Sequence, residues 1–402
     1  MRIAYLIPQF PGQTHIFFWR EIQALRKMGL IVDVVSTRKP PQNIVCHTWS
    51  EKAMSQTQYL TPVNLLAFFE GIWMVLKAGP FRLYQCIKVV KQSPKISIKM
   101  RLKMLMLIPV AGCLIQLARK NRWQHYHAHS CAHSALLLLY VRLLSDLSYS
   151  LTLHGPLSMY GPAQRDKWLH ADFGITVTEK LRNEVLESLP EVREESIFVA
   201  PMGVNLDVFI RRTEYVPPMP PGPFKIITCG RLHFGKGHQD LIRAIAELNE
   251  DKMDVYLKIM GEGSEYSALE RLINDLDLID RVVLMGAVAE ETVRDELEQA
   301  HVFALASHDE AIGVAIMEAM AMSLPVVVTD VGGVNELVRD GREGLLVKPH
   351  SPSDMAKAIG DLLMDSKRCC RLGKLGAKRV TQRFSSERSA ELIYGQLVSR
   401  MH

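Results

Sequence analysis

The chain has 402 residues, of which 48% are hydrophobic and 23% are charged, and its formal net charge is +5. A chain of this length and composition buries a sizeable core and is too long for one ordinary domain, so two domains are expected. Its seven cysteines are scattered without CxxC spacing, which argues against a secreted disulfide scaffold and predicts a reducing compartment.

The first half of the chain alternates short runs of Val, Ile and Leu with segments of helical periodicity, the pattern of parallel sheets covered by helices. The apolar run at the N-terminus reaches Pro8 at once, so we interpret it as a first strand and not as a signal peptide. A helix, Phe17–Lys27, is predicted after it. The predicted strands are Ile3–Pro8, Ile31–Ser36, Tyr126–Ala128, Tyr149–Leu153, Phe173–Val177 and Ile197–Val199.

The second half repeats this alternation after a proline-rich stretch, Val216–Pro223, which we interpret as the interdomain linker. We predict an α/β chain of two Rossmann-like domains, residues 1–210 with a last helix at 385–402, and residues 211–384. The second set of predicted strands is Lys225–Cys229, Val255–Met260, Val282–Met285, Val302–Leu305, Pro325–Thr329 and Gly344–Val347.

A glycine-rich turn, Gly230–Gly237, lies between the predicted strand Lys225–Cys229 and a helix that begins at His238. The free N–H groups and the helix dipole of such a turn favour phosphate, and Arg231 and Lys236 add positive charge. An ordinary turn with solvated basic residues is the alternative. Two cations at the carboxyl end of a strand favour a binding site, because open α/β sheets bind ligands there.

Two glutamates, Glu310 and Glu318, stand eight residues apart after the predicted strand Val302–Leu305. Within one helix they would not converge, but both reach one extended ligand if Glu310 lies in the loop and Glu318 in the following helix. The turn Ala311–Val314 then offers its amides to a diphosphate, and Glu318 binds ribose hydroxyls. The alternative is a loop acid and a solvated helix acid without a function.

These motifs, with Met260–Gly263 and Val331–Glu336, resemble those of the retaining GT-B glycosyltransferases of family 4, of the exopolysaccharide or lipid-linked oligosaccharide type. The resemblance covers nearly the whole chain and is strongest from Ile197 to Pro349. It implies two Rossmann-like domains facing across a cleft, with the C-terminal helix crossing back to the first domain. It also implies a retaining hexosyltransferase that uses a nucleotide sugar and requires no metal or other cofactor.

The resemblance assigns roles to individual residues. The basic pair contacts the donor diphosphate, the acidic pair holds the donor sugar and ribose, and His154 lies near the reacting sugar. Two positions depart from the family, because Ala311 replaces a common glycine and Gly313 a common proline. The predicted catalytic residues are Arg231, Lys236, Glu310 and His154, and the predicted donor-binding residues are Gly230, Gly261, Gly263, Ala311, Ile312, Gly313, Val314 and Glu318.

On the acceptor side, the segment Gln9–Phe17 resembles a loop of exopolysaccharide-type members, with Gly12, Gln13 and Thr14 as the predicted contacts. His127 and His129 alternate along a predicted strand and therefore share a face. Because no carboxylate or cysteine completes a recognisable set with them, we predict structural or sugar-contact roles and no metal site.

Three other functions compete with sugar transfer. A Rossmann dehydrogenase needs G-x-G-x-x-G after the first strand, where Gly12 stands alone. A nucleotide-sugar epimerase of GT-B fold would release free UDP without an acceptor product. A non-catalytic carbohydrate- or lipid-binding relative would show no transfer, and the two glutamates and two cations argue against it. The donor, a UDP- or GDP-sugar, and the acceptor stay open.

The segment Gly71–Ser145 contains twelve Lys and Arg residues and no Asp or Glu. We interpret Ser93 and Pro94 as a helix start, after which Lys95, Lys99 and Lys103 share one face. The apolar residues nearby are Ile96, Met100, Met104 and Leu107, with Phe68, Phe69, Ile72 and Trp73 upstream.

This pattern predicts a cytoplasmic protein in peripheral contact with anionic lipid on the inner face of the cytoplasmic membrane. A lipid-linked or oligosaccharide acceptor is expected there. A helix packed on the core with solvated lysines is the alternative, and no aromatic-interleaved motif supports nucleic acid. The longest apolar run, Met104–Leu117, falls short of the roughly 18 residues that span a bilayer.

Overall fold

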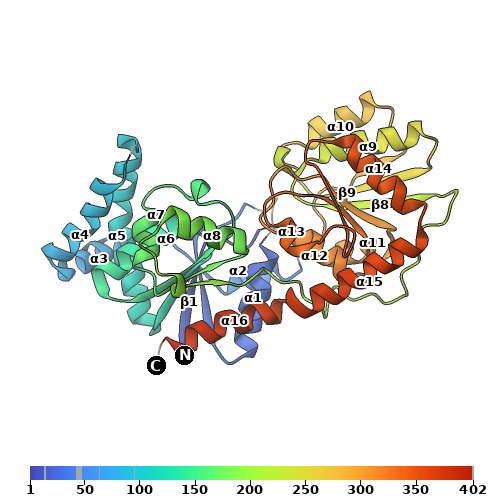
Figure 1. The fold of residues 1–402 in the computed structure, drawn as a ribbon. Helices are drawn as coiled ribbons and strands as arrows, with labels where there is room; N and C mark the ends of the chain where they lie inside the picture. Colours follow the sequence, from blue (N-terminus) through green and yellow to red (C-terminus); the bar gives the residue numbers. More distant parts are fainter. Residues whose placement is uncertain (13–14, 42–47, 63, 95, 401–402) are drawn as a thin grey trace. The chain divides into compact units, whose positions relative to one another are not determined.

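The computed structural model describes residues 1–402 apart from 13–14, 42–47, 63, 95 and 401–402. The chain forms two compact α/β units (Figure 1). Unit 1 comprises Met1–Val45, Trp49–Ala200 and Ala390–His402, and unit 2 comprises Cys46–Thr48 and Pro201–Ser389. Each unit contains one fully parallel sheet, so two Rossmann-like domains are confirmed.

The sheet of unit 1 has seven strands in the order β3-β2-β1-β4-β5-β6-β7. Their bounds are β1 (Arg2–Gln9), β2 (Ile31–Arg38), β3 (Thr57–Tyr59), β4 (His125–Ala128), β5 (Ser148–Leu153), β6 (Phe173–Thr176) and β7 (Ile197–Val199). Six of them match predicted strands, and β3 was not predicted. Its three residues pair only with β2, at the edge of the sheet, and are too few to show a period.

Helices cover both faces of this sheet. One face packs on α1 and on α16, with Ile3 and Tyr5 of β1 in the same core as Ile22, Ile393 and Leu397. On the other side, α6 packs against β1, β4 and β5. The helices are α1 (Ile16–Lys27), α2 (Ser50–Ser55), α3 (Leu65–Ala78), α4 (Pro80–Gln92), α5 (Ile98–Asn121), α6 (His133–Ser145), α7 (Gln164–Leu169), α8 (Glu179–Ser188) and α16 (Ser386–Ser399).

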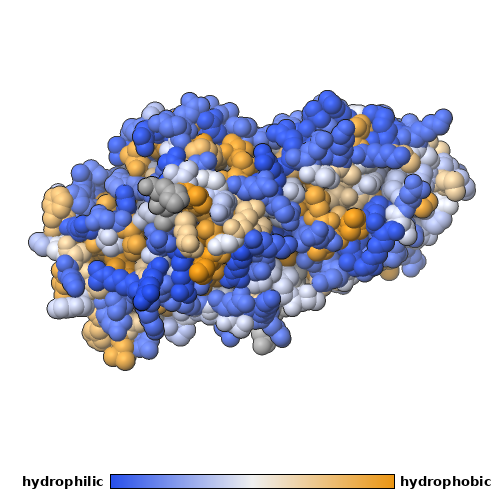
Figure 2. Space-filling view, turned by 90° about the horizontal axis from the view of Figure 1, so that it is seen from below, coloured by the Kyte–Doolittle hydropathy of each residue, from blue (hydrophilic) through white to orange (hydrophobic). Residues whose placement is uncertain are grey.

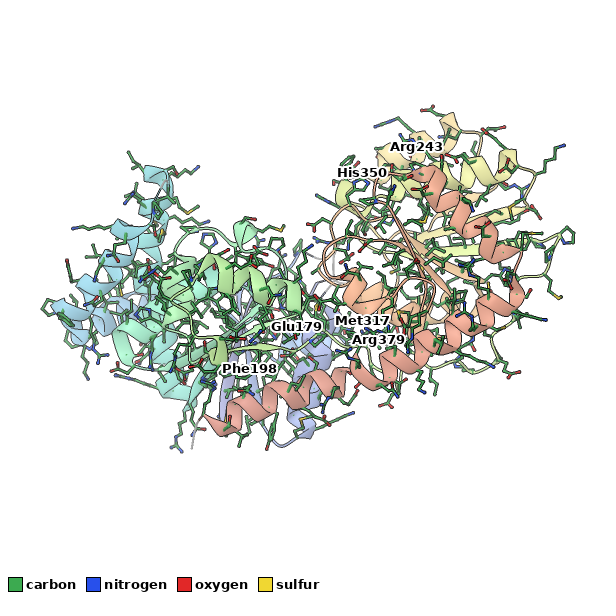
Figure 3. All side chains as sticks on the ribbon, viewed as in Figure 1. Glu179, Phe198, Arg243, Met317, His350 and Arg379 are labelled. Carbon is green, nitrogen blue, oxygen red and sulfur yellow. The ribbon has the colours of Figure 1, made fainter. Side chains whose placement is uncertain are left out.

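The last helix, α16, returns the chain to unit 1, as the fold prediction required. Its side chains Ala390, Ile393 and Leu397 are buried in the core of that unit. Just beyond the helix, the Arg400 guanidinium lies 5.5 Å from the ring centroid of Phe198 on β7, which Figure 3 labels. The C-terminal segment is therefore a structural part of unit 1.

Helices α3, α4 and α5 form an insertion between β3 and β4. Helices α3 and α5 are in close contact at Gly71 and Gly112. Only glycine fits at position 112, because a Cβ there would lie 2.1 Å from the carbonyl oxygen of Gly71. The thiol of Cys113 donates to the Ala67 carbonyl at 3.0 Å beside this crossing. Among the described residues, no helix has both the length and the apolar character needed to cross a membrane.

The predicted helix start at Ser93 and Pro94 is wrong. Ser93 instead follows α4, where its hydroxyl donates to the Val89 carbonyl at 2.9 Å. Helix α5 begins at Ile98, and the Ser97 hydroxyl accepts from the Met100 N–H at 3.2 Å as its cap. The basic residues of this region are thus divided between two helices, and Lys95 lies outside the described residues.

The sheet of unit 2 has six strands in the order β10-β9-β8-β11-β12-β13. The strands are β8 (Phe224–Cys229), β9 (Val255–Met260), β10 (Val282–Leu284), β11 (Val302–Leu305), β12 (Val326–Thr329) and β13 (Leu345–Val347). The helices are α9 (His238–Glu250), α10 (Tyr266–Asp275), α11 (Glu290–Gln299), α12 (Val314–Ala321), α13 (Val334–Leu337), α14 (Pro352–Leu363) and α15 (Ser366–Arg383). All six predicted strands are present.

Alternate residues of these strands enter two separate cores. Ile226 of β8 packs in the core that contains α9, α10 and α14, whereas the next residue, Ile227, packs in the core that contains α11, α12 and α13. Because helices cover both faces of the sheet, both faces of each strand are apolar. This explains why the strands are continuous hydrophobic runs in the sequence. Met317 of α12, labelled in Figure 3, lies in the second of these cores.

The proline-rich stretch is not the linker between the units. The division falls between Ala200 and Pro201, and Val216–Pro223 lies inside unit 2, immediately before β8. Ser366 Oγ donates to the Pro218 carbonyl of this stretch at 2.5 Å, and Tyr215, the residue just before the stretch, donates from Oη to the His301 carbonyl at 2.7 Å. The proline-rich stretch therefore precedes the first strand of the unit 2 sheet and does not separate the two domains.

Candidate functional site

The motifs of unit 2 meet at the carboxyl edge of its sheet. Strands β8 and β11 are neighbours, and the chain leaves them in opposite directions along the sheet, toward β9 and toward β12. Open α/β sheets bind ligands in the crevice at this switch point. The glycine-rich turn follows β8, and the segment with Glu310 follows β11.

Lys236 and Glu310 form an ion pair at this switch point, with Nζ of the lysine against Oε2 of the glutamate. Their side chains are only 23% and 11% exposed, respectively. The hydroxyl of Ser307 donates to the same carboxylate oxygen at 3.4 Å. The two residues lie 74 positions apart in the chain, and the structure brings them together.

Two glycines allow the loops around this pair to touch. Gly237 has φ +64°, and a Cβ there would lie 1.8 Å from the carbonyl oxygen of Ala306. Gly332, in the loop after β12, has φ +56°, and its Cβ would lie 1.7 Å from the carbonyl oxygen of Glu310. The N–H of Gly333 donates to the Ala311 carbonyl at 3.0 Å. The loop after β12 therefore holds Glu310 and Ala311 in place.

The predicted donor-binding glycines Gly261 and Gly263 pack against the glycine-rich turn. A Cβ on Gly261 would lie 1.8 Å from the carbonyl oxygen of Gly230, and a Cβ on Gly263 would lie 2.2 Å from that of Leu232. The N–H of Leu232 also donates to the Glu262 carbonyl at 3.0 Å. Gly261 and Gly263 thus allow the close packing that holds the glycine-rich turn in place. The sequence motif alone does not distinguish this packing role from contact with a ligand.

Helix α12 begins beside Glu310. Gly313 is its N-cap residue, with φ +86°, and Val314 is its first helical residue, so the first amides of the helix have no intrahelical partner. Ile312 is fully buried in the core, so its side chain faces away from a ligand. Glu318 lies inside α12 and is only 7% exposed. The prediction of a loop glutamate and a helix glutamate is correct.

Arg231 is the second residue after β8, and it is exposed to solvent. It lies next to Gly230, at the same edge of the sheet as Lys236. The site therefore combines one cation held by a carboxylate with one exposed cation. A separate cavity of ≈ 350 Å³ in unit 2 is lined by residues at the starts of β8 and β9, among them Lys225 and Tyr256, and none of the motif residues lines it.

In unit 1, His154 lies at the corresponding edge, directly after β5. Its Nε2 is 3.2 Å from Nδ1 of His129, which follows β4. Nε2 of His129 is in turn 3.0 Å from Oε1 of Glu21, on α1. Burial lowers the pKa of both imidazoles to about 3 and raises the pKa of the Glu21 carboxyl. Both imidazoles are therefore neutral near pH 7.

The predicted acceptor-side loop is described only in part. Gly12 is buried after β1, its carbonyl accepts from the His15 N–H at 2.9 Å, and a Cβ there would lie 2.9 Å from Nδ1 of His15. Gln13 and Thr14 lie outside the described residues. Gly12 follows β1, and His129 follows β4. Because these two strands are neighbours in the sheet, both residues lie at the same part of its edge.

The sequence argument against a carboxylate beside the histidine pair is wrong. Ligand atoms of Glu21, His127 and His129 lie within 4.8 Å of one another. However, both ring nitrogens of His127 already bind hydroxyls, at 2.7 Å to Ser150 and 2.9 Å to Thr152. Glu21 was missed by the sequence analysis because this residue lies on a helix, 106 positions before His127 in the sequence. No regular spacing in the sequence relates the two residues.

A second group with metal-ligating atoms within 4.8 Å consists of Asp240, His308 and His350. Nε2 of His308 is 2.7 Å from Oδ2 of Asp240, which ties the loop after β11 to the first turn of α9. The rings of His308 and His350 are 3.8 Å apart, and Figure 3 labels His350 in the loop after β13. Sequence reasoning missed this group, although His308 is only two residues before Glu310.

Comparison with known proteins identifies unit 2. Residues 212–379, which lie within unit 2, match the family described as Glycosyl transferases group 1. A D-inositol 3-phosphate glycosyltransferase of Paenarthrobacter aurescens is 33% identical over 222 residues, 51% of this chain and 54% of that protein. A GDP-mannose-dependent alpha-(1-6)-phosphatidylinositol monomannoside mannosyltransferase of Mycolicibacterium smegmatis is 31% identical, over 44% of this chain and 50% of that protein. The chain spans about half the length of these relatives.

Solved structures extend the likeness in fold over both units. The HepE protein of Anabaena, in complex with UDP and glucose, has a TM-score of 0.76 at 18% identity and covers 99% of this chain and 100% of its own. A sucrose-phosphate synthase of Thermosynechococcus elongatus has a TM-score of 0.75 at 20% identity and covers 100% of this chain and 99% of its own. At these identities, the likeness establishes the two-domain fold.

Proposed function

We propose that this protein is a retaining glycosyltransferase of family 4 type, which moves a hexose from a nucleotide sugar to an acceptor in polysaccharide or glycolipid synthesis. The observation that carries the proposal is the Lys236–Glu310 pair at the switch point of a group 1 domain, beside the first turn of α12. A cation, a carboxylate and helix-terminal amides in one place suit a ligand that contains both a diphosphate and sugar hydroxyls.

Sugar transfer develops negative charge on the departing diphosphate, and donors that are already in place stabilise this charge best where water is scarce. Lys236, Arg231 and the amides of Gly313 and Val314 would bind that diphosphate. Glu310 would accept hydrogen bonds from the sugar, and Glu318, buried on α12, from the ribose. These assignments rest on the position of each residue at the carboxyl edge of the sheet.

We propose further that the reaction retains the anomeric configuration and that the leaving phosphate takes the acceptor proton. Burial lowers the pKa of His154 to about 3, so this imidazole is a poor general base near pH 7. The chain then needs no dedicated base. Two cations beside the diphosphate would supply the charge that a divalent ion supplies in other transferases, so we propose that no metal is required.

A donor screen tests the function. UDP-, GDP- and ADP-sugars are added singly, and thermal unfolding is followed, because a ligand at 100 times its dissociation constant adds roughly 2.7 kcal/mol of stability. A donor that stabilises the protein is then supplied with candidate acceptors, and the products are analysed. Stabilisation and a glycosylated product are expected. Free nucleotide with an epimerised sugar and no acceptor product would establish an epimerase instead, and no response to any donor would contradict the proposal.

For the acceptor we propose a lipid-linked sugar on an anionic membrane surface, with helices α3 to α5 making the peripheral contact. Helix α3 is apolar on two opposite faces. Gly71, Met74 and Val75 are buried, whereas Leu66, Phe69, Trp73 and Leu76 are between 63% and 73% exposed. Such a face on a soluble domain marks a contact surface. The relative that acts on phosphatidylinositol monomannoside, according to its name, supports a lipid acceptor.

Helices α4 and α5 also expose apolar side chains. Phe81 and Tyr84 are exposed at the start of α4, and Ile98, Leu102 and Met106 are exposed along α5. Figure 2 shows hydrophobic patches among hydrophilic side chains at its left-hand end, where Figure 1 draws these helices. Of the apolar residues expected there from the sequence, Phe69 and Trp73 are exposed, Met104 is buried, and Phe68, Ile72, Ile96, Met100 and Leu107 are partly buried.

The same three helices carry exposed lysines, namely Lys77, Lys88, Lys91, Lys99 and Lys103. Within the described part of the chain, none of the five forms an ion pair. By contrast, Arg82 is paired with Asp146. Anionic lipid is worth about 1 kcal/mol for each nearby basic residue, so five lysines and a shallow apolar face favour an anionic bilayer over a neutral one.

Vesicle flotation tests the membrane contact with vesicles of neutral lipid alone and with one third anionic lipid. We expect salt-sensitive binding to the anionic vesicles, lost in the double variants Phe69→Ser with Trp73→Ser and Lys88→Glu with Lys91→Glu. Ile279→Ser, which changes an apolar residue of unit 2 that is 63% exposed, is the matched control. Absence of binding at low salt would refute the contact, and concentration-dependent dimerisation through the same residues would point to a second copy as the occupant.

A further inference from the structure

Glu21 and His129, two polar residues far apart in the sequence, form a hydrogen-bonded chain that leads to His154. Oε1 of Glu21 is 3.0 Å from Nε2 of His129, and Nδ1 of His129 is 3.2 Å from Nε2 of His154. Glu21 comes from α1, and the two histidines follow β4 and β5 at the carboxyl edge of the sheet. The Glu21 carboxylate, at 12% exposure, and the His129 side chain, at 0%, are shielded from water.

The direction of these hydrogen bonds follows from the acceptor at one end. Oε1 of Glu21 accepts from the Tyr5 hydroxyl at 2.8 Å, and we take the same oxygen as the acceptor toward His129. Nε2 of His129 must therefore carry its proton. A neutral imidazole has one N–H, so Nδ1 of His129 accepts, and Nε2 of His154 must donate to it.

The chain of bonds determines which nitrogen of His154 is left without a proton. Its Nδ1 is buried and has no hydrogen-bond partner among the described residues. Aromatic rings from α1 restrict the imidazole, with the Phe17 centroid 5.3 Å and the Phe18 centroid 5.5 Å from that of His154. A buried acceptor without a partner is costly, and a ligand hydroxyl would satisfy it.

We propose that Glu21 and His129 are positioning residues, which fix His154 in the tautomer whose Nδ1 accepts a hydrogen bond from a hydroxyl of the bound sugar. The sugar as the ligand rests on the proposed function, whereas the tautomer rests on the geometry of unit 1 alone. His154 thereby selects a hydroxyl at one position and disfavours a sugar that lacks it, because the buried acceptor would then stay unpaired.

The tautomer is measured first, on the full chain without any substrate. With ¹⁵N-labelled histidine, the ring signals of His154 are assigned by their loss in His154→Gln. At pH 7 we expect a neutral ring protonated at Nε2, and in Glu21→Leu a mixture of both tautomers. A ring protonated at Nδ1 in the wild type, or an unchanged single tautomer in Glu21→Leu, would overturn the proposal.

Activity variants then test the positioning role. Glu21→Gln keeps an amide oxygen that accepts from Tyr5 and His129, and His129→Asn keeps an oxygen near the former Nδ1, so both should retain transfer within about threefold. Glu21→Leu and His129→Leu should lower kcat about tenfold or more, with KM for the nucleotide sugar changed less, because orientation of the reacting sugar is lost.

Equal losses in the conservative and the apolar variants, or a loss confined to KM, would contradict positioning through the tautomer. Thermal unfolding of each variant shows whether the fold is kept, and the ring signals of His154 remain readable in any variant that folds. If no donor supports transfer in the wild type, the proposed function fails, and the histidine spectra still decide the tautomer.

Discussion

Nζ of Lys236 contacts Oε2 of Glu310, and this contact joins the loop after β8 to the loop after β11. The two residues carry opposite charges at the place where a sugar diphosphate would need both. Before a donor binds, each charge balances the other in a setting with little exposure to water. A donor with a phosphate and a hydroxyl at the right separation would contact both members of the pair.

Lys236→Met should lower turnover at least tenfold, because a charge-assisted contact to the diphosphate is worth about 1.5–3 kcal/mol and more in the transition state. Steady-state kinetics with the donor found in the screen measure this. Lys258→Met is the matched control, since Lys258 pairs with Glu296 at 2.6 Å elsewhere in unit 2. Wild-type turnover in Lys236→Met would exclude Lys236 from the site.

Glu318→Gln should weaken donor binding about tenfold while leaving thermal stability nearly unchanged, because an amide fits the same space but loses charge-assisted hydrogen bonds to hydroxyls. Calorimetric titration with the nucleotide alone isolates this effect from the sugar. Glu270→Gln, on the exposed side of α10, controls for the change of net charge. Unchanged affinity for the nucleotide would contradict the ribose role.

Transfer should continue in EDTA, because under the proposed mechanism Lys236 and Arg231 would provide the positive charge at the diphosphate. Initial rates are compared with and without the chelator, after dialysis against it. Complete loss of activity, restored by magnesium or manganese, would contradict the metal-independent mechanism. It would direct attention to the groups Glu21, His127 and His129, and Asp240, His308 and His350.

Gly263→Ala should destabilise unit 2 by about 1–3 kcal/mol, because the new methyl group would lie 2.2 Å from the Leu232 carbonyl oxygen and force two loops apart. Urea unfolding measures this change. Gly395→Ala on α16 is the control, since nothing lies within 4 Å of the new atom. That substitution should be neutral or stabilise by up to about 1 kcal/mol, as glycine disfavours a helix interior. Equal effects would reject the packing argument.

The buried histidines should make stability depend on pH. Burial lowers the pKa of His125 to about 3, below its unfolded value of roughly 6.5. Its contribution to stability is therefore complete above pH 6.5 and is lost as pH falls toward 3, at up to about 1.4 kcal/mol per pH unit. His125→Asn should flatten the decline in unfolding free energy between pH 7 and pH 5, whereas His170→Asn, at an exposed site, should not. Identical slopes in wild type and His125→Asn would disprove the linkage.

The strands and the order of motifs could be predicted because their signals are local. Val-, Ile- and Leu-rich runs identify β8 and β11, and the glycines that follow them mark the loops. The loop position of Glu310 and the helix position of Glu318 follow from where β11 ends. Knowing that the strands are parallel then suffices to predict that motifs far apart in sequence share one edge of the sheet.

Contacts between side chains on separate elements could not be predicted in this way. Glu21 reaches His129 because α1 packs on β1, which is the neighbour of β4 in the sheet, and no spacing in the sequence encodes this. The prediction of a helix start at Ser93 was wrong for a related reason. Ser93 and Ser97 both precede apolar residues, and only the hydrogen bonds they make distinguish the end of α4 from the start of α5.

The return of α16 to unit 1 has a consequence for biosynthesis. Residues near both ends of the chain, such as Ile3 and Leu397, share one core, and all of unit 2 lies between those two residues in the sequence. During translation, unit 1 therefore leaves the ribosome first but lacks one helix of its core until after unit 2 has been made, although domains generally fold in the order of synthesis. The apolar surface that α16 covers in the folded protein, including Ile3 and Ile22, therefore stays exposed until the last helix has been synthesised, unless a chaperone shields it.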